Sequence, residues 1–409
     1  MRRRLAVILA QAALLVSGCA NAPRGPAPLT MTAAVAPTGF PATVRYVGVD
    51  RAFFLTHMEE DTARLRRATG GGSLNILALS GGGAGGAFGA GALVGSSRRP
   101  DHPQFTVVTG VSTGALLAPF AYLGPDWNPQ LTEAFGGDRA EHLLRSRGLG
   151  FLFSPGFYQG RPLARLVDEF VTDDLIRAVA VENTKGRLLL VATTDLDKQE
   201  TVIWDMGAIA SKGGPAARDL FAKVLLASAT IPGVFPPVLI PVEGGGKSYV
   251  EMHVDGGTTV PFFFASELAY VVPLEFEKLK DANLYVLVAG QLVAQPQTTR
   301  ATTVEVLVRS FDATLRRSTR TTVELSAAFA HRYGVNFRFT QIPTDYPFGG
   351  PIDFKATATR ALFAYGMRCA EQGRLWTTID QATERNEPAL ASNQTLAPAD
   401  VDCPLLSKP

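Results

Sequence analysis

Short apolar runs alternate with glycine-rich and helical segments along most of this chain. Two of these runs, Leu74–Leu79 and Phe105–Val108, predict buried strands, and each is followed by glycines and then by a segment of small residues that favours a helix. Further strands are predicted at Arg187–Thr194, Thr201–Trp204 and Tyr249–Val254. Strands that alternate with helices typically build a parallel sheet. The pattern therefore predicts an α/β fold, with a mainly parallel central sheet and helices on both faces.

Length and composition suit one large domain or two ordinary ones. The 409 residues are 46% hydrophobic and 19% charged, which allows a sizeable buried core. The net charge is +2, and it becomes about −1 if Arg2, Arg3 and Arg4 are removed with a leader. This near-neutral balance argues against nucleic acid as a partner. It neither requires nor excludes contact with a lipid surface.

The N-terminal residues have the pattern of a secretion signal. Three arginines precede the apolar segment Leu5–Val16, which is too short for a comfortable membrane span, and Ser17-Gly18-Cys19 follows. Val16 to Cys19 resembles the lipobox of bacterial lipoproteins, in which the cysteine becomes the lipidated N-terminus. We therefore expect residues 1–19 to be a lipoprotein signal peptide with Cys19 as the lipidated residue. An ordinary signal peptide cut near Ala20 and an uncleaved anchor are the alternatives.

Residues 20–43 contain five prolines and predict a semi-extended tether between the lipid anchor and the folded domain. Ala20 follows the cysteine, and there is no aspartate at that position to signal retention in the inner membrane. We therefore expect a protein anchored by lipid in the cell envelope, in the outer membrane rather than the inner one.

Ser112 is the candidate nucleophile. Gly110-Val111-Ser112-Thr113-Gly114 lies between a predicted strand and a predicted helix. This G-x-S-x-G arrangement is typical of a sharp elbow that exposes the serine hydroxyl. Pro119 lies inside the predicted helix and should kink or shorten it. A purely structural turn is the alternative, because glycine and serine are both common.

The glycine-rich loop Ser80–Gly86 follows the first predicted strand and precedes a helix. Backbone N–H groups at a helix N-terminus favour an anion, either a phosphate or an oxyanion formed during a reaction. The loop also satisfies a dinucleotide fingerprint, but Asp101, the acid at the right distance, precedes the next strand instead of ending it. The absence of G-K-[ST] excludes a P-loop. Nucleotide binding and a structural turn remain as alternatives.

Four segments together resemble the patatin-like phospholipases, which are serine lipid acyl hydrolases that use a Ser–Asp dyad. They occur in the family's order and are the glycine loop, the serine elbow, a proline-rich segment and a D-G-G sequence, at Gly81–Gly86, Gly110–Gly114, Ala227–Pro237 and Asp255–Gly257. The resemblance implies a patatin-like hydrolase domain, which we place at residues 44–385, followed by a C-terminal tail at 386–409.

The resemblance also implies the chemistry. It assigns Ser112 as nucleophile and Asp255 as base, with an oxyanion hole at Gly81, Gly82 and Gly83. The expected reaction is hydrolysis of a phospholipid or another acyl-lipid ester through an acyl-enzyme, without a metal or cofactor. The substrate partner would be an acyl lipid, and the membrane would be reached through the N-terminal anchor.

The chain departs from the family in two places. The family usually has a basic residue where this chain has Gly85, which puts the preference for phospholipids in doubt. After D-G-G, the family often has paired asparagines, whereas this chain has Val260-Pro261-Phe262-Phe263-Phe264. These phenylalanines would make the pocket more apolar or would lie in the core. A catalytically inert lipoprotein that binds lipid or a partner is therefore the alternative function.

The remaining candidates concern cysteines, histidines and a mobile segment. If Cys19 is lipidated, Cys369 and Cys403 are left as a pair that could form a disulfide in an oxidising compartment, or remain as two thiols. No C-x-x-C pattern or close His/Cys cluster argues for a metal. His331 follows Asp255 in the chain order of a Ser–Asp–His triad, without a local pattern that supports it. Residues 145–160 are the predicted mobile, membrane-touching segment.

Overall fold

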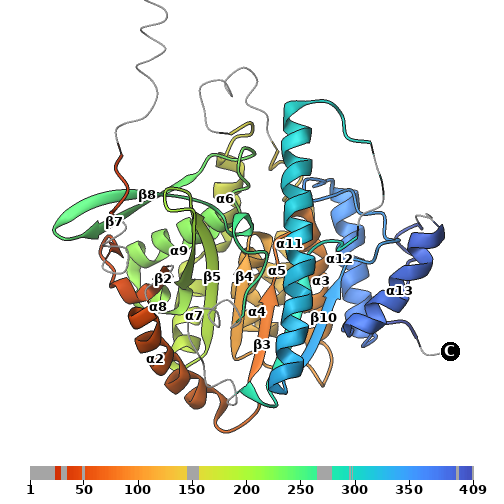
Figure 1. The fold of residues 1–409 in the computed structure, drawn as a ribbon, viewed down its shortest axis with the longest axis horizontal. Helices are drawn as coiled ribbons and strands as arrows, with labels where there is room; N and C mark the ends of the chain where they lie inside the picture. The colour runs from red at the N-terminus through yellow and green to blue at the C-terminus, as the bar shows by residue number, and fades with distance from the viewer. Residues whose placement is uncertain are drawn as a thin grey trace, which may run out of the picture.

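The centre of the molecule is a large mixed sheet (Figure 1). The computed structural model describes residues 24–28, 35–47, 51–144, 156–264, 279–293, 296, 298–392 and 396–407. Within these residues the sheet has ten strands. Neighbouring strands in its central part are parallel, which confirms the predicted parallel core; they follow the order β5 (Leu188–Asp195), β4 (Val107–Val111), β3 (Asn75–Leu79), β9 (Asn283–Val288) and β10 (Asn336–Gln341).

The other strands run antiparallel beyond β5, and we call them the antiparallel wing. Strand β8 pairs with the end of β5, and β6 pairs with the opposite edge of β5. Strands β7 and β1 follow outside β8, while β2 pairs with β6. The wing consists of β1 (Ala36–Pro37), β2 (Arg45–Val47), β6 (Glu200–Asp205), β7 (Val238–Gly244) and β8 (Lys247–Asp255).

Helices cover both faces of the sheet, as predicted. Leu77 and Leu79 of β3 belong to one core, whereas the alternate residues Ile76 and Ala78 belong to another. The first core is covered by α3 (Gly86–Ser97), α4 (Thr113–Leu123), α5 (Asn128–Phe135), α6 (Arg161–Phe170), α7 (Asp173–Thr184), α8 (Met206–Ser211), α9 (Gly214–Ser228) and α12 (Ala356–Glu371). The second core is covered by α2 (Arg51–Thr69), α11 (Thr303–Tyr333) and α13 (Ile379–Ser392).

Several sequence-based expectations can be placed on this fold. Pro119 lies inside α4, which continues to Leu123, so the proline does not end the helix there. Cys19 and most of the segment 145–160 lie outside the described residues. Among the residues that are described, none of the helices combines the length and the hydropathy that a membrane span requires.

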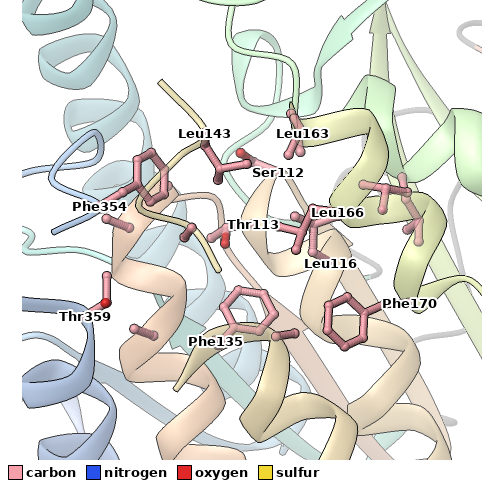
Figure 2. A pocket seen from close by; sticks show the side chains of 18 of the residues that line it. Ser112, Thr113, Leu116, Phe135, Leu143, Leu163, Leu166, Phe170, Phe354 and Thr359 are labelled. Carbon is pink, nitrogen blue, oxygen red and sulfur yellow. The ribbon is translucent and has the colours of Figure 1, made fainter. Parts of the chain in front are cut away.

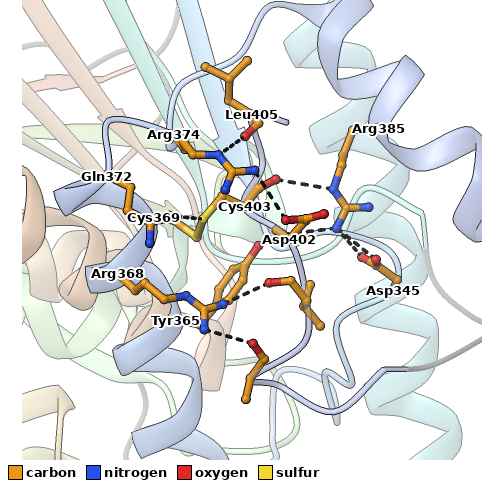
Figure 3. The surroundings of a disulfide bond; sticks show 12 residues. Asp345, Tyr365, Arg368, Cys369, Gln372, Arg374, Arg385, Asp402, Cys403 and Leu405 are labelled. Atoms are coloured by element: carbon orange, nitrogen blue, oxygen red, sulfur yellow. Dashed lines mark hydrogen bonds and ion pairs between the residues drawn. A yellow bond between two sulfur atoms is a disulfide. The ribbon is translucent and has the colours of Figure 1, made fainter. Parts of the chain in front are cut away.

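The C-terminal segment is fastened to α12 (Figure 3). Cys403 forms a disulfide with Cys369, with the two Cα atoms 5.3 Å apart. Close to this bond, the Tyr365 hydroxyl donates to the Asp402 carbonyl at 2.7 Å. Helix α13 also runs across the boundary that we predicted between residues 385 and 386. The C-terminal segment is therefore packed on the folded unit, and the predicted boundary does not separate a tail from it.

Candidate active site

Ser112 lies between the end of β4 and the start of α4, in a strained backbone conformation. Its φ is +56° and its ψ is −126°, a region that glycine adopts and other residues rarely do. The flanking glycines leave no room for a side chain. A Cβ at Gly110 would lie 2.6 Å from the Ala115 Cα, and one at Gly114 would lie 2.4 Å from the Leu79 carbonyl oxygen. The structure thus contains the predicted strand, elbow and helix.

Asp255 reaches Ser112 because β4 and β8 meet end to end along one edge of β5. Val111, the last residue of β4, is opposite Ala192, and the next residue of β5, Thr193, is opposite Asp255. The Ser112 hydroxyl donates to Asp255 Oδ2 at 2.6 Å, across 143 positions of sequence. Both residues are buried, with 5% and 1% of their surface exposed. The structure therefore brings together the two side chains that the family resemblance paired.

The surroundings of the Asp255 carboxyl change its pKa. Burial raises its pKa to about 7, while the hydrogen bonds from the Ser112 hydroxyl and from the Gly257 N–H act in the opposite direction. The Gly257 N–H donates to Oδ1 at 2.7 Å. The backbone is also fixed, because the Asp255 N–H donates to the Thr230 carbonyl at 2.9 Å and its carbonyl accepts from the Thr194 hydroxyl at 3.0 Å. A carboxylate with a pKa near neutrality can accept a proton from the adjacent hydroxyl.

The glycine loop supplies backbone donors, but fewer than predicted. Gly81 donates its N–H to the Pro261 carbonyl at 3.2 Å. This N–H is therefore not available as a donor in the predicted oxyanion hole. Its role is steric, because a Cβ at Gly81 would lie 3.0 Å from the Ser112 Cβ. Within the described part of the chain, the N–H groups of Gly82 and Gly83 have no acceptor. These two donors remain for an anion.

Three glycine positions of the loop have no room for a side chain. A Cβ at Gly82 would lie 1.8 Å from the Ala289 carbonyl oxygen, and one at Gly85 would lie 1.9 Å from the same atom. Gly83 has a φ of +54°, and a Cβ there would lie 2.0 Å from the Pro351 carbonyl oxygen. The basic residue that the family usually has at the position of Gly85 therefore cannot be accommodated in this backbone arrangement.

The sequence comparison agrees with this geometry. Residues 77–266 match the family model of the patatin-like phospholipases. This chain contains a patatin-like phospholipase domain. The family indicates a lipid acyl hydrolase in general terms.

Other comparisons add little to this assignment. A search of curated proteins gives no match. Among solved structures, the crystal structure of VipD from Legionella pneumophila is similar over 80% of this chain and 71% of that chain, with 12% identity and a TM-score of 0.32. A similarity at that level supports no conclusion about this chain.

An apolar pocket opens beside Ser112 of the patatin-like domain (Figure 2). One face of α4 forms a wall of this pocket over eight residues, from Thr113 to Phe120, which is roughly 10 Å at the rise of an α-helix. Helices α5 and α6 supply further walls, and the side chains labelled in Figure 2 include Phe135, Leu163, Leu166 and Phe170. None of the described lining residues is charged. A pocket of this kind favours an alkyl chain over a polar ligand.

The phenylalanines that follow the D-G-G sequence do not contribute to this pocket. Phe262, Phe263 and Phe264 are buried in the second core, on the opposite face of the sheet. The expectation that they make the pocket more apolar is wrong, and the alternative of a core position is correct. Helix α4 and its neighbours provide the apolar walls instead.

Ser228 supports the patatin-like elbow, a role that was not predicted from the sequence. It is fully buried at the end of α9. Its hydroxyl accepts the Ser112 N–H at 2.9 Å and donates to the Ala192 carbonyl at 2.7 Å. Ser228 therefore ties the elbow to β5. The available signal was a small polar residue after the apolar run Val224-Leu225-Leu226-Ala227.

Among the described residues, no histidine hydrogen-bonds to Ser112 or Asp255. The two carboxylate oxygens of Asp255 accept hydrogen bonds from Ser112 and Gly257. His331 is exposed in the last turn of α11, and no hydrogen bond within the described residues links it to Asp255. His253 is buried on β8, with Nδ1 at 3.0 Å from the Thr193 hydroxyl oxygen. The structure gives the Ser–Asp–His alternative no support.

A buried ion cluster lies further along β8. The ligand atoms of Asp195, Glu251 and His253 lie within 4.8 Å of one another. Cations of the chain itself already pair with these carboxylates. Lys198 bridges Asp195 at 2.8 Å and Glu251 at 2.5 Å, and Arg45 contacts Glu251 at 2.5 Å. We therefore interpret the group as a structural ion network instead of a metal site.

Electrostatics within the buried ion cluster favour ionised Glu251. Burial alone would raise the pKa of this carboxyl. The hydrogen bond with His253 and the nearby Arg45 guanidinium outweigh that effect and hold the pKa of Glu251 well below its usual range. Glu251 thus carries its charge throughout the neutral range, and it depends on its cationic partners for compensation.

Proposed function

We propose that this protein is a serine acyl hydrolase that cleaves acyl-lipid esters through an acyl-enzyme on Ser112. The observation that carries the proposal is the 2.6 Å contact between Ser112 Oγ and Asp255 Oδ2. Both side chains are buried beside a pocket whose described lining residues are all uncharged. A hydroxyl paired with a base at the end of an apolar pocket suits an ester whose acyl chain occupies that pocket.

The proposed reaction has two halves. In the first, the Asp255 carboxylate takes the proton of Ser112, and Oγ attacks the ester carbonyl carbon. The tetrahedral intermediate then breaks its bond to the alcohol oxygen, which leaves with the proton held by Asp255. In the second half, a water molecule attacks the acyl-enzyme with Asp255 again as base, and the fatty acid leaves as Ser112 regains its proton.

The oxyanion of each intermediate would accept hydrogen bonds from the backbone N–H groups of Gly82 and Gly83. Loss of one such donor typically raises the barrier by about 3 kcal/mol. The N-terminal end of α4, which begins at Thr113, adds a favourable partial positive charge. These donors belong to a loop that the main chain of Ala289 and Pro351 holds in place.

A fluorophosphonate probe together with Ser112→Ala tests this proposal. We expect the probe to label the wild-type protein at Ser112. We expect Ser112→Ala to lose labelling and to lose hydrolysis of short-chain acyl esters by a factor on the order of 10³ or more. Ser96→Ala, at the end of α3, is the matched control and should behave as the wild type. Unchanged hydrolysis by Ser112→Ala would refute the assignment.

We further propose that the domain is held in the cell envelope through lipidated Cys19, in the outer membrane. The support is the arginine-rich start, the apolar segment and the Val16-Ser17-Gly18-Cys19 sequence. Several acyl chains at about 0.8 kcal/mol per buried CH₂ would give stable anchoring. Metabolic labelling with a fatty acid should mark the wild type and spare Cys19→Ser. Equal labelling of both proteins would contradict the anchor.

A further inference from the structure

Two cavities adjoin consecutive residues of the glycine loop, and their chemistry differs. Gly83 lines the apolar pocket together with Ser112. Gly81 and Gly82 line a second, smaller cavity on the side of α11. Arg316 of α11 lines this second cavity. Asp312 of the same helix lines it as well. The loop of oxyanion donors therefore has an uncharged cavity on one side and, on the other, a cavity that holds a paired arginine and aspartate.

Helix α11 is directly attached to the site. It is the long helix that crosses the front of the sheet in Figure 1. The Leu315 side chain packs against the segment after Asp255, since a Cβ at Gly257 would lie 3.2 Å from Leu315 Cδ1. Arg316 is the next residue. Arg316 lines the second cavity together with Gly81 and Gly82 of the glycine loop.

Arg316 has hydrogen-bonding capacity that the described residues do not use. One terminal nitrogen pairs with Asp312 at 2.6 Å. The other terminal nitrogen, Nη1, is buried and has no hydrogen-bond partner among the described residues. One turn further along α11, Arg320 donates to the Leu292 carbonyl at 3.0 Å, and its Nε is likewise buried without a described partner. Buried donors of this kind are normally satisfied, so their state points to a missing acceptor.

The charges on this face of α11 favour an anion. Arg309, Arg316 and Arg320 are spaced so that they share the face with two acids, Glu305 and Asp312, which leaves a net charge of +1. Asp312 contacts Arg316 at 2.6 Å and lies 4.0 Å from Arg309. The glycine loop itself, from Ser80 to Gly86, contains no basic residue. Among the described residues that line the second cavity, Arg316 is the basic one.

We propose that Arg316 binds the phosphate of a phospholipid whose acyl chain occupies the apolar pocket. The inference rests on the proposed function, because it requires an ester carbonyl at Ser112. With the ester at the glycine loop, the acyl chain extends into the uncharged pocket and the head group extends toward α11. A guanidinium recognises a phosphate through charge-assisted hydrogen bonds, for which Nη1 is the available donor.

The test compares two substrates that share their acyl chains and differ in the head group. Dihexanoyl phosphatidylglycerol carries the phosphate, and dihexanoylglycerol does not. We expect Arg316→Gln to lower the ratio of kcat/KM for the first substrate over the second by roughly tenfold to a hundredfold. Arg316→Lys keeps the charge and should lose less. The matched control is Arg317→Gln, on an exposed neighbouring residue of the same helix, and its ratio should stay unchanged.

Asp312→Asn provides a second, independent variant. It removes the acid that competes for Arg316, so the ratio should rise above that of the wild type. An unchanged ratio in folded Arg316→Gln overturns the proposal while the hydrolase itself stands. If Arg316→Gln does not fold, an unchanged or lowered ratio in Asp312→Asn overturns it. Failure of the wild type to hydrolyse either substrate refutes the hydrolase assignment and this inference with it.

Discussion

The two halves of the candidate active site are held in different ways. Ser112 belongs to the parallel core, where a short contiguous segment fixes its backbone between β4 and α4. Asp255 belongs to the antiparallel wing, and β8 pairs with β5 over only three residues of β5, Thr193 to Asp195. The hydroxyl therefore depends on local backbone geometry, whereas the carboxyl depends on contacts between distant parts of the chain.

The buried ion cluster is one of the long-range contacts on which the position of Asp255 depends. Glu251, His253 and Asp255 alternate along β8 and therefore project to the same side of the strand. Glu251 pairs with Arg45, and Arg45 also donates to the Val35 carbonyl at 2.9 Å. The strand that ends in the proposed base is thus tied to Val35. This residue is buried beside β1, so the described residues 35–43 pack on the sheet, and the predicted tether is wrong for this part of the chain. This comparison suggests that the two halves can be perturbed separately.

The largest effect should come from Asp255→Asn. It removes the proposed base and leaves the shape of the side chain nearly unchanged. We expect hydrolysis of short-chain acyl esters to fall by a factor on the order of 10² to 10⁴, which is the usual range for general-base catalysis. Fluorophosphonate labelling of Ser112 should slow in parallel. Full activity of Asp255→Asn would show that the carboxyl has no catalytic role.

Arg45→Met should destabilise the antiparallel wing, which carries the proposed base Asp255. Removal of one partner from a buried ion pair typically lowers the free energy of unfolding by about 3–5 kcal/mol, because the other charge stays buried without compensation. Urea unfolding measures this loss. Arg66→Met, at an exposed arginine of α2, is the matched control. If Arg45→Met is as stable as the control, the cluster does not hold the wing in place.

The pH dependence of activity should report the ionisation of Asp255. Because burial raises its pKa to about 7, kcat/KM for a neutral ester should rise through about pH 7 and then level off. Below that value, activity should fall about tenfold per pH unit as the base becomes protonated. An activity that is flat between pH 5 and 8 would contradict the assigned base.

Stability should follow the opposite direction. The folded-state pKa of Asp255 lies above its unfolded value, so the contribution of this group is fully present below the unfolded pKa and is lost as the pH rises through about 7. Asp255→Asn should therefore be more stable than the wild type at pH 8, and the difference should shrink toward pH 4. Urea midpoints at both pH values check the sign.

The same contrast explains what the sequence could and could not predict. The elbow around Ser112 and the glycine loop are contiguous, so strand, glycine and helix signals identify them directly. The pairing of Ser112 with Asp255 came from the family resemblance, because pattern and spacing carry no information about contacts across 143 positions. The contact between Arg45 and Glu251 spans 206 positions and was not predicted.

Errors in the predicted site have equally physical causes. Gly81 was assigned to the oxyanion hole because it belongs to the loop, but its N–H is used by Pro261 from the segment after the D-G-G sequence. Phe262 was weighed as a pocket residue because it is apolar, and the face of the sheet that it covers depends on the tertiary fold. Sequence thus locates the donors and apolar groups without showing which of them remain available.

Ser228→Ala probes the nucleophile side with a smaller effect. It leaves the Ser112 N–H without its acceptor, which typically costs 1–3 kcal/mol and should loosen the elbow. We expect kcat to fall about tenfold, with KM and the pH inflection unchanged, because Ser228 positions Ser112 without contacting substrate. Ser326→Ala, at a buried serine on α11, is the control for a general loss of packing. Equal effects of the two variants on kcat would leave Ser228 without a positioning role.

The smallest effect isolates the strain at Ser112. Ser112→Ala and Ser112→Gly both remove the hydroxyl, so they differ only in the presence of Cβ. At an ordinary position alanine is the more stable of the two by about 0.4–1 kcal/mol, because glycine has more freedom in the unfolded chain. At a φ of +56° and a ψ of −126°, a residue with a Cβ pays roughly 1–3 kcal/mol of strain, which glycine avoids. We therefore expect Ser112→Gly to unfold at a higher urea concentration than Ser112→Ala. The reverse order would mean that the elbow is relaxed, and that the local half of the site owes its geometry to something other than the strained turn.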